Sequence, residues 1–313
     1  MQNLEQILIE AHKKCASITD WLRLSVSLFN QYELFFGHGT SNAHDEATYL
    51  ILKTLNLPID QLTPYLDAKL LDHEIQALIE MLNKRIIERM PAPYITREAI
   101  FHDYIFYVDQ RVIIPRSFIG EIILHGGLDE YIPHRELVNN VLDLCTGNGS
   151  LAVVASDYFY ASEVTAIDID KDALEVAKIN INRYSLEDRI KLVRSDLFNK
   201  LKPENQYDLI LTNPPYVDKK HMQNLPKEYL HEPRLALFGG NDGLKLVRKI
   251  IEESRFYLTQ FGMLIVEMGN NVDELEEYYP LLNFTWLETI NDGAVFMLTK
   301  AQLDAYFLDT QNI

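Results

Sequence analysis

From Val138 onward, short β-branched and apolar runs alternate with amphipathic helical stretches. Residues 141–145, 164–168, 190–193, 208–212 and 263–267 have the composition of strands. Helical patterns extend to residue 158 and cover 174–181, 243–258 and 272–279. This alternation predicts an α/β fold with a mainly parallel sheet that is covered on both faces. A last hairpin, residues 286–290 and 294–298 around Asn291-Asp292-Gly293, would add one antiparallel strand.

The first ninety or so residues show no strand-like alternation. Apolar residues recur at the spacing of one helix face over residues 4–11 and 72–89, which predicts a small helical bundle. Residues 94–115 are β-branched and aromatic and predict a β-hairpin with its turn near Asp109-Gln110. We therefore expect a helical domain over residues 1–92, a hairpin linker over 93–116 and a catalytic domain over 117–313.

The charge balance limits the partners of the chain. Lys and Arg total 29 against 46 Asp and Glu, a net charge of −17. This excess opposes stable binding to nucleic acid and favours basic partners such as ribosomal proteins. Two distant cysteines, no recognisable secretory signal and no apolar run of about 18 residues predict a cytoplasmic protein that does not span a membrane. The histidines have no consistent ligand spacing, so we expect no metal site.

A glycine-containing turn follows the first expected strand, in Asp143-Leu144-Cys145-Thr146-Gly147-Asn148-Gly149-Ser150. Gly147 and Gly149 would let the backbone approach a ligand, and the helix start would offer free N–H groups. A plain strand–helix connection is the simplest alternative. The pattern of Gly147, Gly149 and Ala152 also fits a dinucleotide-binding turn, so a nicotinamide enzyme stays open at this point.

Two carboxylates follow the next strands. Asp168 ends the second strand and could accept hydrogen bonds from ribose hydroxyls, although a helix N-cap is an alternative that Asp170 could equally supply. Asp196 ends the third strand and could accept a hydrogen bond from an exocyclic adenine amine. Its alternative is an ordinary loop carboxylate.

The fourth strand stops abruptly at Asn213-Pro214-Pro215-Tyr216. The two prolines stiffen the turn, because each one restricts the residue before it to extended conformations. The Asn213 side-chain oxygen and the Pro214 carbonyl could then accept both hydrogens of one planar NH2 group, with Tyr216 stacked beside it. Such an amide or aromatic amine is a weak nucleophile, so methylating it requires orientation and stabilisation of the developing positive charge. A rigid loop without chemistry is the alternative.

Together these motifs resemble, in order and spacing, the class I S-adenosylmethionine-dependent amino-methyltransferases. The stretch Glu232-Pro233-x-x-Ala236-Leu237-x-Gly239-Gly240-x-Asp242-Gly243-Leu244 and the helical N-terminus narrow the resemblance to the HemK-like protein glutamine N5-methyltransferases. The resemblance implies a Rossmann-like, mostly parallel seven-stranded sheet with a terminal antiparallel hairpin. It also implies a substrate-recognition role for the helical bundle and S-adenosyl-L-methionine as cofactor.

The resemblance also assigns roles to single residues. Gly147 and Gly149 would face the methionine part of the cofactor, with backbone contacts from Cys145, Thr146 and Asn148 and support from Asp143. Asp168 would bind the ribose, Asp196 would lie near adenine, and Arg116, within Ile114-Pro115-Arg116-Ser117, would belong to a segment that caps the cofactor. Asn213 and Pro214 would accept from the substrate amide, with Pro215 and Tyr216 completing the catalytic corner.

Two subtypes of this family differ in their substrate. One modifies a glutamine of peptide-chain release factors, and the other modifies a glutamine in a large-subunit ribosomal protein. Residues 36–47, Phe-Gly-His-Gly-Thr-Ser-Asn-Ala-His-Asp-Glu-Ala, and residues 116–121 resemble the second type. N-methylation of an exocyclic amine in RNA or DNA, which would use the same corner on a base out of its stack, and a non-catalytic adaptor or nicotinamide-binding protein remain alternatives.

Overall fold

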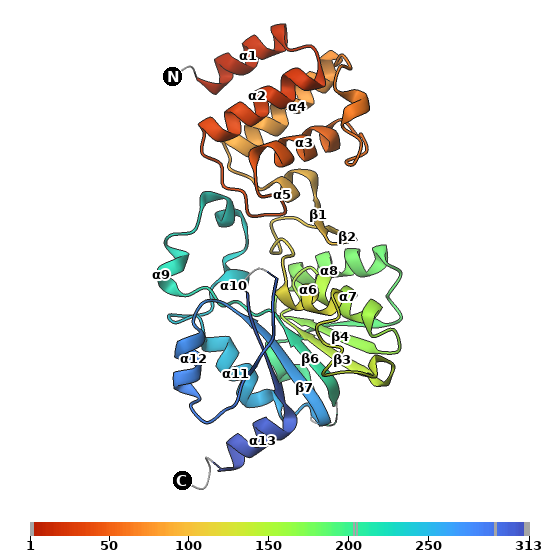
Figure 1. Ribbon diagram of the computed structural model, residues 1–313, viewed down its shortest axis with the longest axis vertical. Coiled ribbons are helices and arrows are strands. Elements are labelled where there is room, and N and C mark those ends of the chain that lie inside the picture. The colour runs from red at the N-terminus through yellow and green to blue at the C-terminus, as the bar shows by residue number, and fades with distance from the viewer. Residues whose placement is uncertain (1–2, 203, 205, 291–292, 310–313) are drawn as a thin grey trace. The chain divides into compact units, whose positions relative to one another are not determined.

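The computed structural model describes residues 3–202, 204, 206–290 and 293–309. The chain forms two compact units (Figure 1). The first, the helical unit, comprises residues up to Ile105 together with Pro226–His231, and the second, the α/β unit, comprises Phe106–Leu225 and the chain from Glu232 onward. The chain therefore passes between the units at three places, after Ile105, after Leu225 and after His231.

The helical unit confirms the predicted bundle. Its α-helices are α1 (Leu4–Lys14), α2 (Ile18–Gln31), α3 (Ala43–Thr54), α4 (Asp72–Ile86) and α5 (Ala92–Thr96), with 3-10 turns η1 (Thr63–Tyr65) and η4 (Lys227–His231). Local chemistry sets the helix starts: Ser17 forms a capping box with Asp20 at α2, and the Asn42 side chain accepts the Asp45 N–H at α3. The fully buried Trp21 and Phe29 lie in its core.

The predicted hairpin exists, but its turn was placed wrongly. Strands β1 (Glu98–Phe101) and β2 (Tyr104–Tyr107) form a two-stranded sheet, and the chain turns between them at His102, which has a φ of 51°. A turn does lie at Asp109-Gln110, where the Val112 N–H donates to the Asp109 carbonyl at 3.1 Å, but it follows β2 instead of joining the two strands. The Asp109 carboxylate also accepts the backbone N–H and guanidinium of Arg111 there.

The α/β unit contains a seven-stranded sheet of order β5-β4-β3-β6-β7-β9-β8. Its strands are β3 (Asn140–Leu144), β4 (Glu163–Asp168), β5 (Ile190–Arg194), β6 (Tyr207–Thr212), β7 (Leu258–Met268), β8 (Thr285–Trp286) and β9 (Ala294–Thr299). Strands β3 to β7 pair in parallel, and β9 runs antiparallel to both β7 and β8. The predicted mainly parallel sheet with one antiparallel strand is confirmed. The expected turn at Asn291-Asp292-Gly293 falls mostly on residues 291 and 292, which lie outside the described residues.

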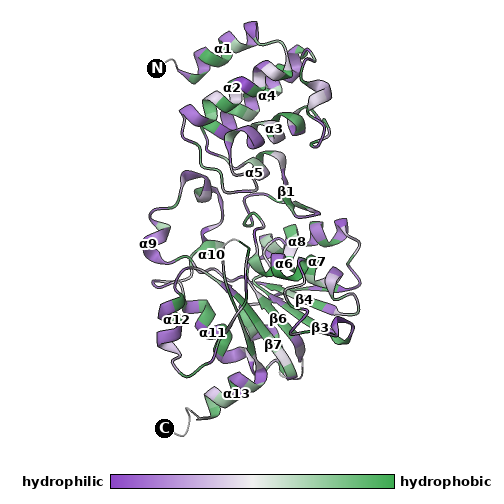
Figure 2. Ribbon diagram, in the orientation of Figure 1, coloured by the Kyte–Doolittle hydropathy of each residue, from purple (hydrophilic) through white to green (hydrophobic). Residues whose placement is uncertain are grey.

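Both faces of this sheet are covered, as the burial of four successive β6 residues from Leu209 to Thr212 shows. The α-helices are α6 (Phe118–Leu124), α7 (Ser150–Tyr158), α8 (Lys171–Arg183), α9 (Lys219–Met222), α10 (Arg234–Leu237), α11 (Lys245–Ser254), α12 (Val272–Tyr278) and α13 (Lys300–Asp309), with 3-10 turns η2 (Arg135–Leu137) and η3 (Leu197–Lys200). One face of the strands forms a core with α11, α12 and α13, and α7 and α8 pack on β3, β4 and β5. Figure 2 shows hydrophobic residues concentrated on the central strands.

The expectation that the last hairpin closes the chain was wrong, because α13 follows β9 directly. The start of this helix has a signal in the sequence. Thr299 and Gln302 form reciprocal side-chain to backbone hydrogen bonds of 2.8 and 3.2 Å, the pattern of a capping box. Across the described residues, no helix has both the length and the apolar character needed to cross a membrane.

Candidate active site

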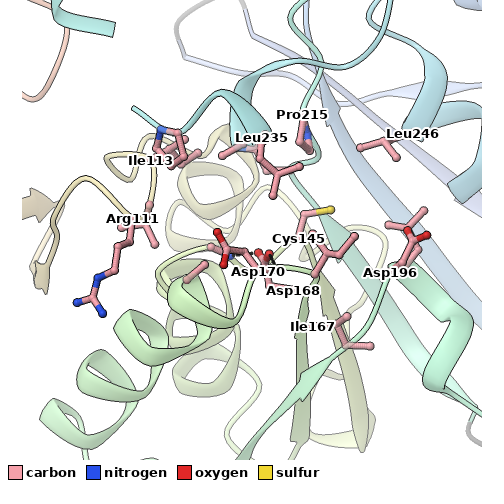
Figure 3. Close-up of a pocket in the computed structure, with 18 of the residues that line it drawn as sticks. Arg111, Ile113, Cys145, Ile167, Asp168, Asp170, Asp196, Pro215, Leu235 and Leu246 are labelled. Carbon is pink, nitrogen blue, oxygen red and sulfur yellow. Dashed lines mark hydrogen bonds between the residues drawn. The ribbon is translucent and has the colours of Figure 1, made fainter. Parts of the chain in front are cut away.

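The carboxyl ends of four neighbouring strands meet at one edge of the sheet. Leu144 of β3 is in register with Ile167 of β4 and with Thr212 of β6, while Asp168 pairs with Arg194 of β5. A pocket opens at this edge, as expected for a parallel sheet (Figure 3). Its lining residues are Arg111, Val112, Ile113, Cys145, Gly147, Ile167, Asp168, Ile169, Asp170, Ala173, Ser195, Asp196, Leu197, Asn213, Pro215, Pro233, Leu235, Ala236 and Leu246.

The turn between β3 and α7 makes one wall of the pocket. Cys145, Gly147 and Gly149 all have positive φ, at 60°, 55° and 80°. At Gly149 the reason is packing, since a Cβ there would lie 3.2 Å from the Ala177 Cβ. A Cβ on Gly147 would meet no protein atom within 4 Å, and this residue lines the pocket. The space that a side chain would fill at Gly147 therefore suits a bound ligand, so the turn fits a cofactor at this wall.

Asp168 holds this turn and also faces the pocket. Its Oδ2 accepts the Gly147 N–H and its Oδ1 accepts the Asp170 N–H, both at 2.9 Å. The N-cap of α8 is Asp170, so Asp168 does not serve as the helix cap. Burial raises the pKa of Asp168, against the backbone hydrogen bonds from Asp170 and Gly147 that lower it. Figure 3 shows Asp168 beside Cys145, with Asp196 further along the pocket.

Asp196 is more open than Asp168. Its side chain is 48% exposed, with the Lys249 Nζ 3.7 Å from its Oδ2. It lies two residues after the end of β5 and lines the pocket, so it can meet a ligand from the solvent side.

Other predicted cofactor residues lie behind the turn. Asp143 is 1% exposed, and its Oδ2 accepts the Thr146 hydroxyl at 2.6 Å. Burial raises the pKa of Asp143 to about 7. Asn148 is also buried, and its side-chain oxygen accepts the Ser150 N–H at 3.1 Å. Asp143, Thr146 and Asn148 therefore shape the turn from behind, while Cys145 and Gly147 line the pocket itself.

The Asn213-Pro214-Pro215-Tyr216 turn, hereafter the acceptor corner, makes a second wall. Asn213 and Pro215 line the pocket, and Pro214 is buried. The preceding Thr212 fixes the corner to the first wall, because its hydroxyl donates to the Leu144 carbonyl at 2.9 Å. The corner thus faces the same pocket as the glycine turn rather than the protein core.

Glycines allow the backbone to pack closely around the acceptor corner. A Cβ on Gly239 would lie 2.5 Å from the Pro215 carbonyl oxygen, and one on Gly243 would lie 2.3 Å from the Tyr216 carbonyl oxygen. On the ring side, a Cβ on Gly269 would lie 3.0 Å from the Tyr216 Cδ2. Gly239 and Gly243 of the 232–244 motif are therefore required because no side chain fits between them and the corner.

A buried carboxyl lies behind Tyr216. Glu267 of β7 is 0% exposed, and its Oε1 accepts the Tyr216 hydroxyl at 3.5 Å. Its Oε2 accepts the Ser117 hydroxyl at 2.9 Å. Burial raises the pKa of Glu267 to about 7, although the Ser117 hydrogen bond lowers it. Neither the sequence pattern nor the resemblance pointed to this residue.

Arg116, which is partly exposed, forms an ion pair with the buried Glu232 at the start of the 232–244 motif. Its guanidinium donates to both carboxylate oxygens of Glu232, at 2.6 and 2.7 Å, and the Ile114 N–H donates to the same carboxylate at 3.0 Å. Two parallel hydrogen bonds of this kind fix both partners firmly. Arg116 is not among the pocket-lining residues and holds Glu232, while its role towards the cofactor stays a prediction.

Several lining residues were not expected from the sequence. Arg111, Val112 and Ile113 were predicted as part of a strand, but they form a segment at the pocket edge. Leu235 and Leu246 line it from the side of Pro215, as Figure 3 shows. Apolar residues after a strand give no recognisable signal in a single sequence. Among the described residues, no group of three or more His, Cys, Asp or Glu side chains could hold a metal ion.

Comparison with known proteins gives similar chains over nearly the full length. A family model described as Methyltransferase small domain matches residues 128–240. The ribosomal protein uL3 glutamine methyltransferase of Neisseria meningitidis is 52% identical over 295 residues, which cover 94% of this chain and 96% of the relative. The protein of the same name from Burkholderia pseudomallei is 48% identical over 296 residues, covering 92% and 96%.

A solved structure with a similar fold is the hMettl16 catalytic domain in complex with MAT2A 3′UTR hairpin 6. Its TM-score is 0.50 at 15% identity, and the match covers 77% of this chain and 86% of that chain. At this identity the likeness concerns the fold alone. The curated relatives match both units, because no more than 8% of this chain lies outside either alignment.

Proposed function

Because this chain belongs to the family of ribosomal protein uL3 glutamine methyltransferases, we propose that it transfers a methyl group from S-adenosylmethionine to the side-chain amide nitrogen of a glutamine in uL3. The observation that supports this most directly is the shared pocket: Asn213 and Pro215 line it together with Gly147 and Asp168. The proposed cofactor and acceptor groups thus face one space.

When bound, S-adenosylmethionine supplies an electrophilic methyl carbon on a sulfonium sulfur, and the carbon–sulfur bond breaks as the amide nitrogen bonds to that carbon. The open space at Gly147 receives the methionine part of the cofactor. Each Asp168 oxygen already accepts one backbone N–H and has a second lone pair for a ribose hydroxyl. Asp196 accepts from the adenine amine.

The acceptor corner orients the glutamine. The Asn213 side-chain oxygen and the Pro214 carbonyl accept the two amide hydrogens, and both dipoles stabilise the positive charge that develops on nitrogen. Pro215 keeps Pro214 extended, so this carbonyl keeps its direction. The Tyr216 hydroxyl is directed to Glu267, which leaves the ring to pack beside the amide. After the transfer the nitrogen carries a positive charge and two protons, and it releases one of these protons to water.

The helical unit is proposed to recognise the protein substrate, with residues 1–92 in this role and residues 93–116 as the linker. The curated relatives named for uL3 match this part of the chain as well as the pocket. The net charge of −17 also suits a basic ribosomal protein.

The test uses purified protein, S-adenosylmethionine with a labelled methyl group and purified uL3. We expect label on a single glutamine, located by mass spectrometry, and loss of that label when the glutamine is changed to alanine. Asn213→Ala should lower turnover about 100-fold or more, the cost of one preorganised acceptor, while calorimetry shows unchanged cofactor binding. Asn139→Ala is the matched control, since its side chain is exposed and donates to Leu137 at the other end of β3.

The same assay separates the alternatives. Label on a release factor instead of uL3 would assign the chain to the other glutamine-modifying subtype. Protease-resistant label on bare RNA or DNA would indicate methylation of an exocyclic amine. Binding of a nicotinamide dinucleotide without binding of S-adenosylmethionine would reject the methyltransferase proposal altogether.

A further inference from the structure

The chain between the acceptor corner and Gly239 forms a long loop that is closed at its base. The Val217 N–H donates to the Leu237 carbonyl at 2.8 Å, and the Gly239 N–H donates to the Val217 carbonyl at 2.9 Å. We call residues 217–237 the acceptor loop. Its base follows Tyr216 directly and lies in the α/β unit, but its tip, Pro226–His231, belongs to the helical unit.

A buried carboxylate holds this tip. Glu228 is 0% exposed, and its Oε1 lies 3.2 Å from the Arg85 guanidinium and 3.0 Å from that of Arg89. The same oxygen accepts the Phe35 N–H at 3.1 Å. Burial by itself would raise the pKa of Glu228, but the Phe35 N–H and the two guanidinium groups outweigh it and lower the pKa. Glu228 is thus an ionised anchor in the interior of the helical unit.

The anchor meets the sequence stretch that distinguished the subtype. Arg85 also donates to Glu46 at 2.6 Å, and the Thr40 hydroxyl donates to the second oxygen of Glu46 at 3.0 Å. His38 packs against Tyr229, with ring centroids 4.3 Å apart. The stretch of residues 36–47, which the proposed chemistry does not use, therefore contacts the tip of the acceptor loop through His38 and is linked to Glu228 through Glu46 and Arg85.

Two carboxylates four positions apart hold the loop in different units. Glu232 is fixed by Arg116 and the Ile114 N–H in the α/β unit, next to the lining residue Pro233. Glu228 is fixed by Arg85 and Arg89 in the helical unit. A buried ion cluster adds little net stability compared with apolar packing, and its better-attested use is to specify one arrangement. Here the arrangement that it specifies is the path of the acceptor loop.

We propose that Glu228 is a positioning residue for the methyl-acceptor site: it fixes the tip of the acceptor loop in the helical unit and so couples docking of the protein substrate to the acceptor corner. This inference rests on the proposed function, because it concerns the same reaction. The coupling selects a whole ribosomal protein that engages the helical unit over a glutamine side chain presented alone. The rim of the cofactor pocket keeps its own anchor at Glu232.

The test compares two charge-neutralising variants of one cluster. Glu228→Gln weakens the ion pairs that hold the tip. Glu46→Gln weakens the other ion pair of Arg85, the one with Glu46, but leaves Glu228 bound to Arg85, Arg89 and Phe35. Glu228→Gln should raise the KM for uL3 about tenfold, the effect of one charged hydrogen bond, with the cofactor Kd unchanged. Glu46→Gln should change the same KM less than about threefold even if both variants lose equal thermal stability.

Amide hydrogen exchange provides a readout that does not depend on the substrate. Exchange over residues 217–225 should become faster in Glu228→Gln than in Glu46→Gln, and Glu228→Asp, which keeps the charge, should restore part of the protection. Equal exchange in the two Gln variants would overturn the coupling, as would an equal rise in KM. Wild-type protein that leaves uL3 unlabelled would reject the proposed function instead, and the exchange data would still decide whether Glu228 holds the loop.

Discussion

The two walls of the pocket are held in different ways. At the glycine turn, two carboxylates hold the chain by hydrogen bonds: Asp168 accepts the Gly147 backbone N–H, and Asp143 accepts the Thr146 side-chain hydroxyl. At the acceptor corner, the fit is steric, with Gly239, Gly243 and Gly269 leaving no room for a side chain beside residues 215 and 216. The first wall keeps open space for a ligand, whereas the second is rigid. A flexible cofactor can adapt to its site, but the proposed chemistry needs the amide nitrogen in one direction.

The largest expected effect comes from breaking the steric fit. Gly243→Ala places a Cβ 2.3 Å from the Tyr216 carbonyl oxygen at a φ of +75°, so the acceptor corner must shift. A displacement of about 1 Å at the reacting groups lowers turnover about 100-fold. Overpacking and the left-handed backbone together should cost about 2–4 kcal/mol of unfolding free energy. Steady-state kinetics and denaturant unfolding measure both effects.

Gly39→Ala separates the collision from the backbone strain. Gly39 also has a positive φ, at +105°, but a Cβ there would meet nothing within 4 Å. We expect a loss of about 1 kcal/mol and little change in turnover. If Gly243→Ala behaves like Gly39→Ala, the corner is not sterically fixed and the comparison of the two walls is wrong.

This contrast marks what a single sequence could predict. The apolar run before Pro214-Pro215 and the glycines after the first strand identify strand ends, because they depend on local rules of backbone geometry. The reason for Gly243 could not be predicted, since it depends on Tyr216, 27 positions earlier, reaching the same point in space. The pairing of Arg116 with Glu232 could not be predicted for the same reason, since the two residues lie 116 positions apart.

The fold followed from the sequence more fully than the site did. The alternation and length of the apolar runs sufficed to predict the parallel strands. Nothing in the sequence indicated that Lys227–His231 belongs with the helical unit. Its neighbours in sequence belong to the other unit, and its place there depends on Glu228 meeting Arg85, 143 positions away. The periodicity of a sequence does not reveal an ion pair between residues that lie so far apart along the chain.

The next effect tests the first wall through its acceptors. Asp168→Ala removes the proposed ribose acceptor and the hold on the Gly147 N–H at once. Hydrogen bonds to a charged group contribute about 1.5–3 kcal/mol each, so calorimetry should show cofactor binding weakened about 10- to 100-fold. Asp172→Asn, in the exposed first turn of α8, is the control. Unchanged affinity in Asp168→Ala would remove this residue from the proposed cofactor site.

The two glycines of the first wall should respond in opposite ways. Gly147→Ala points a Cβ into open space in the pocket, so it should weaken cofactor binding about tenfold while costing only about 1 kcal/mol of stability for the left-handed backbone. Gly149→Ala places its Cβ 3.2 Å from Ala177. It should destabilise the fold more and the cofactor complex less. Calorimetry measures the cofactor affinity of the two variants, and thermal unfolding measures their stability. If one variant lost more of both quantities than the other, the prediction would be contradicted.

The last comparison concerns the pH dependence that comes from the buried carboxyl behind each wall. Burial raises the pKa of Asp143 from 3.8 to about 7 and that of Glu267 from 4.5 to about 7. Below about pH 4 both groups are protonated in the folded and unfolded states, and their stabilisation is fully present. As the pH rises to about 7, the unfolded chain releases these protons first, so the free energy of unfolding falls, by on the order of 3 kcal/mol per group. Asp143→Asn and Glu267→Gln should each remove part of this slope.

Only the carboxyl of the second wall should also affect the pH dependence of turnover. Ionised Glu267 accepts the Tyr216 hydroxyl more strongly than the neutral acid does, and nearby Arg116 favours the ionised form. Turnover of the wild type should therefore rise about two- to threefold between pH 6 and pH 8, the size of one weak hydrogen bond. Glu267→Gln and Tyr216→Phe should both lose this rise, whereas Asp143→Asn should keep it, because its partner Thr146 lies behind the cofactor wall. A rise that persists in Glu267→Gln would show that the two buried carboxyls are equivalent and that Glu267 serves stability alone.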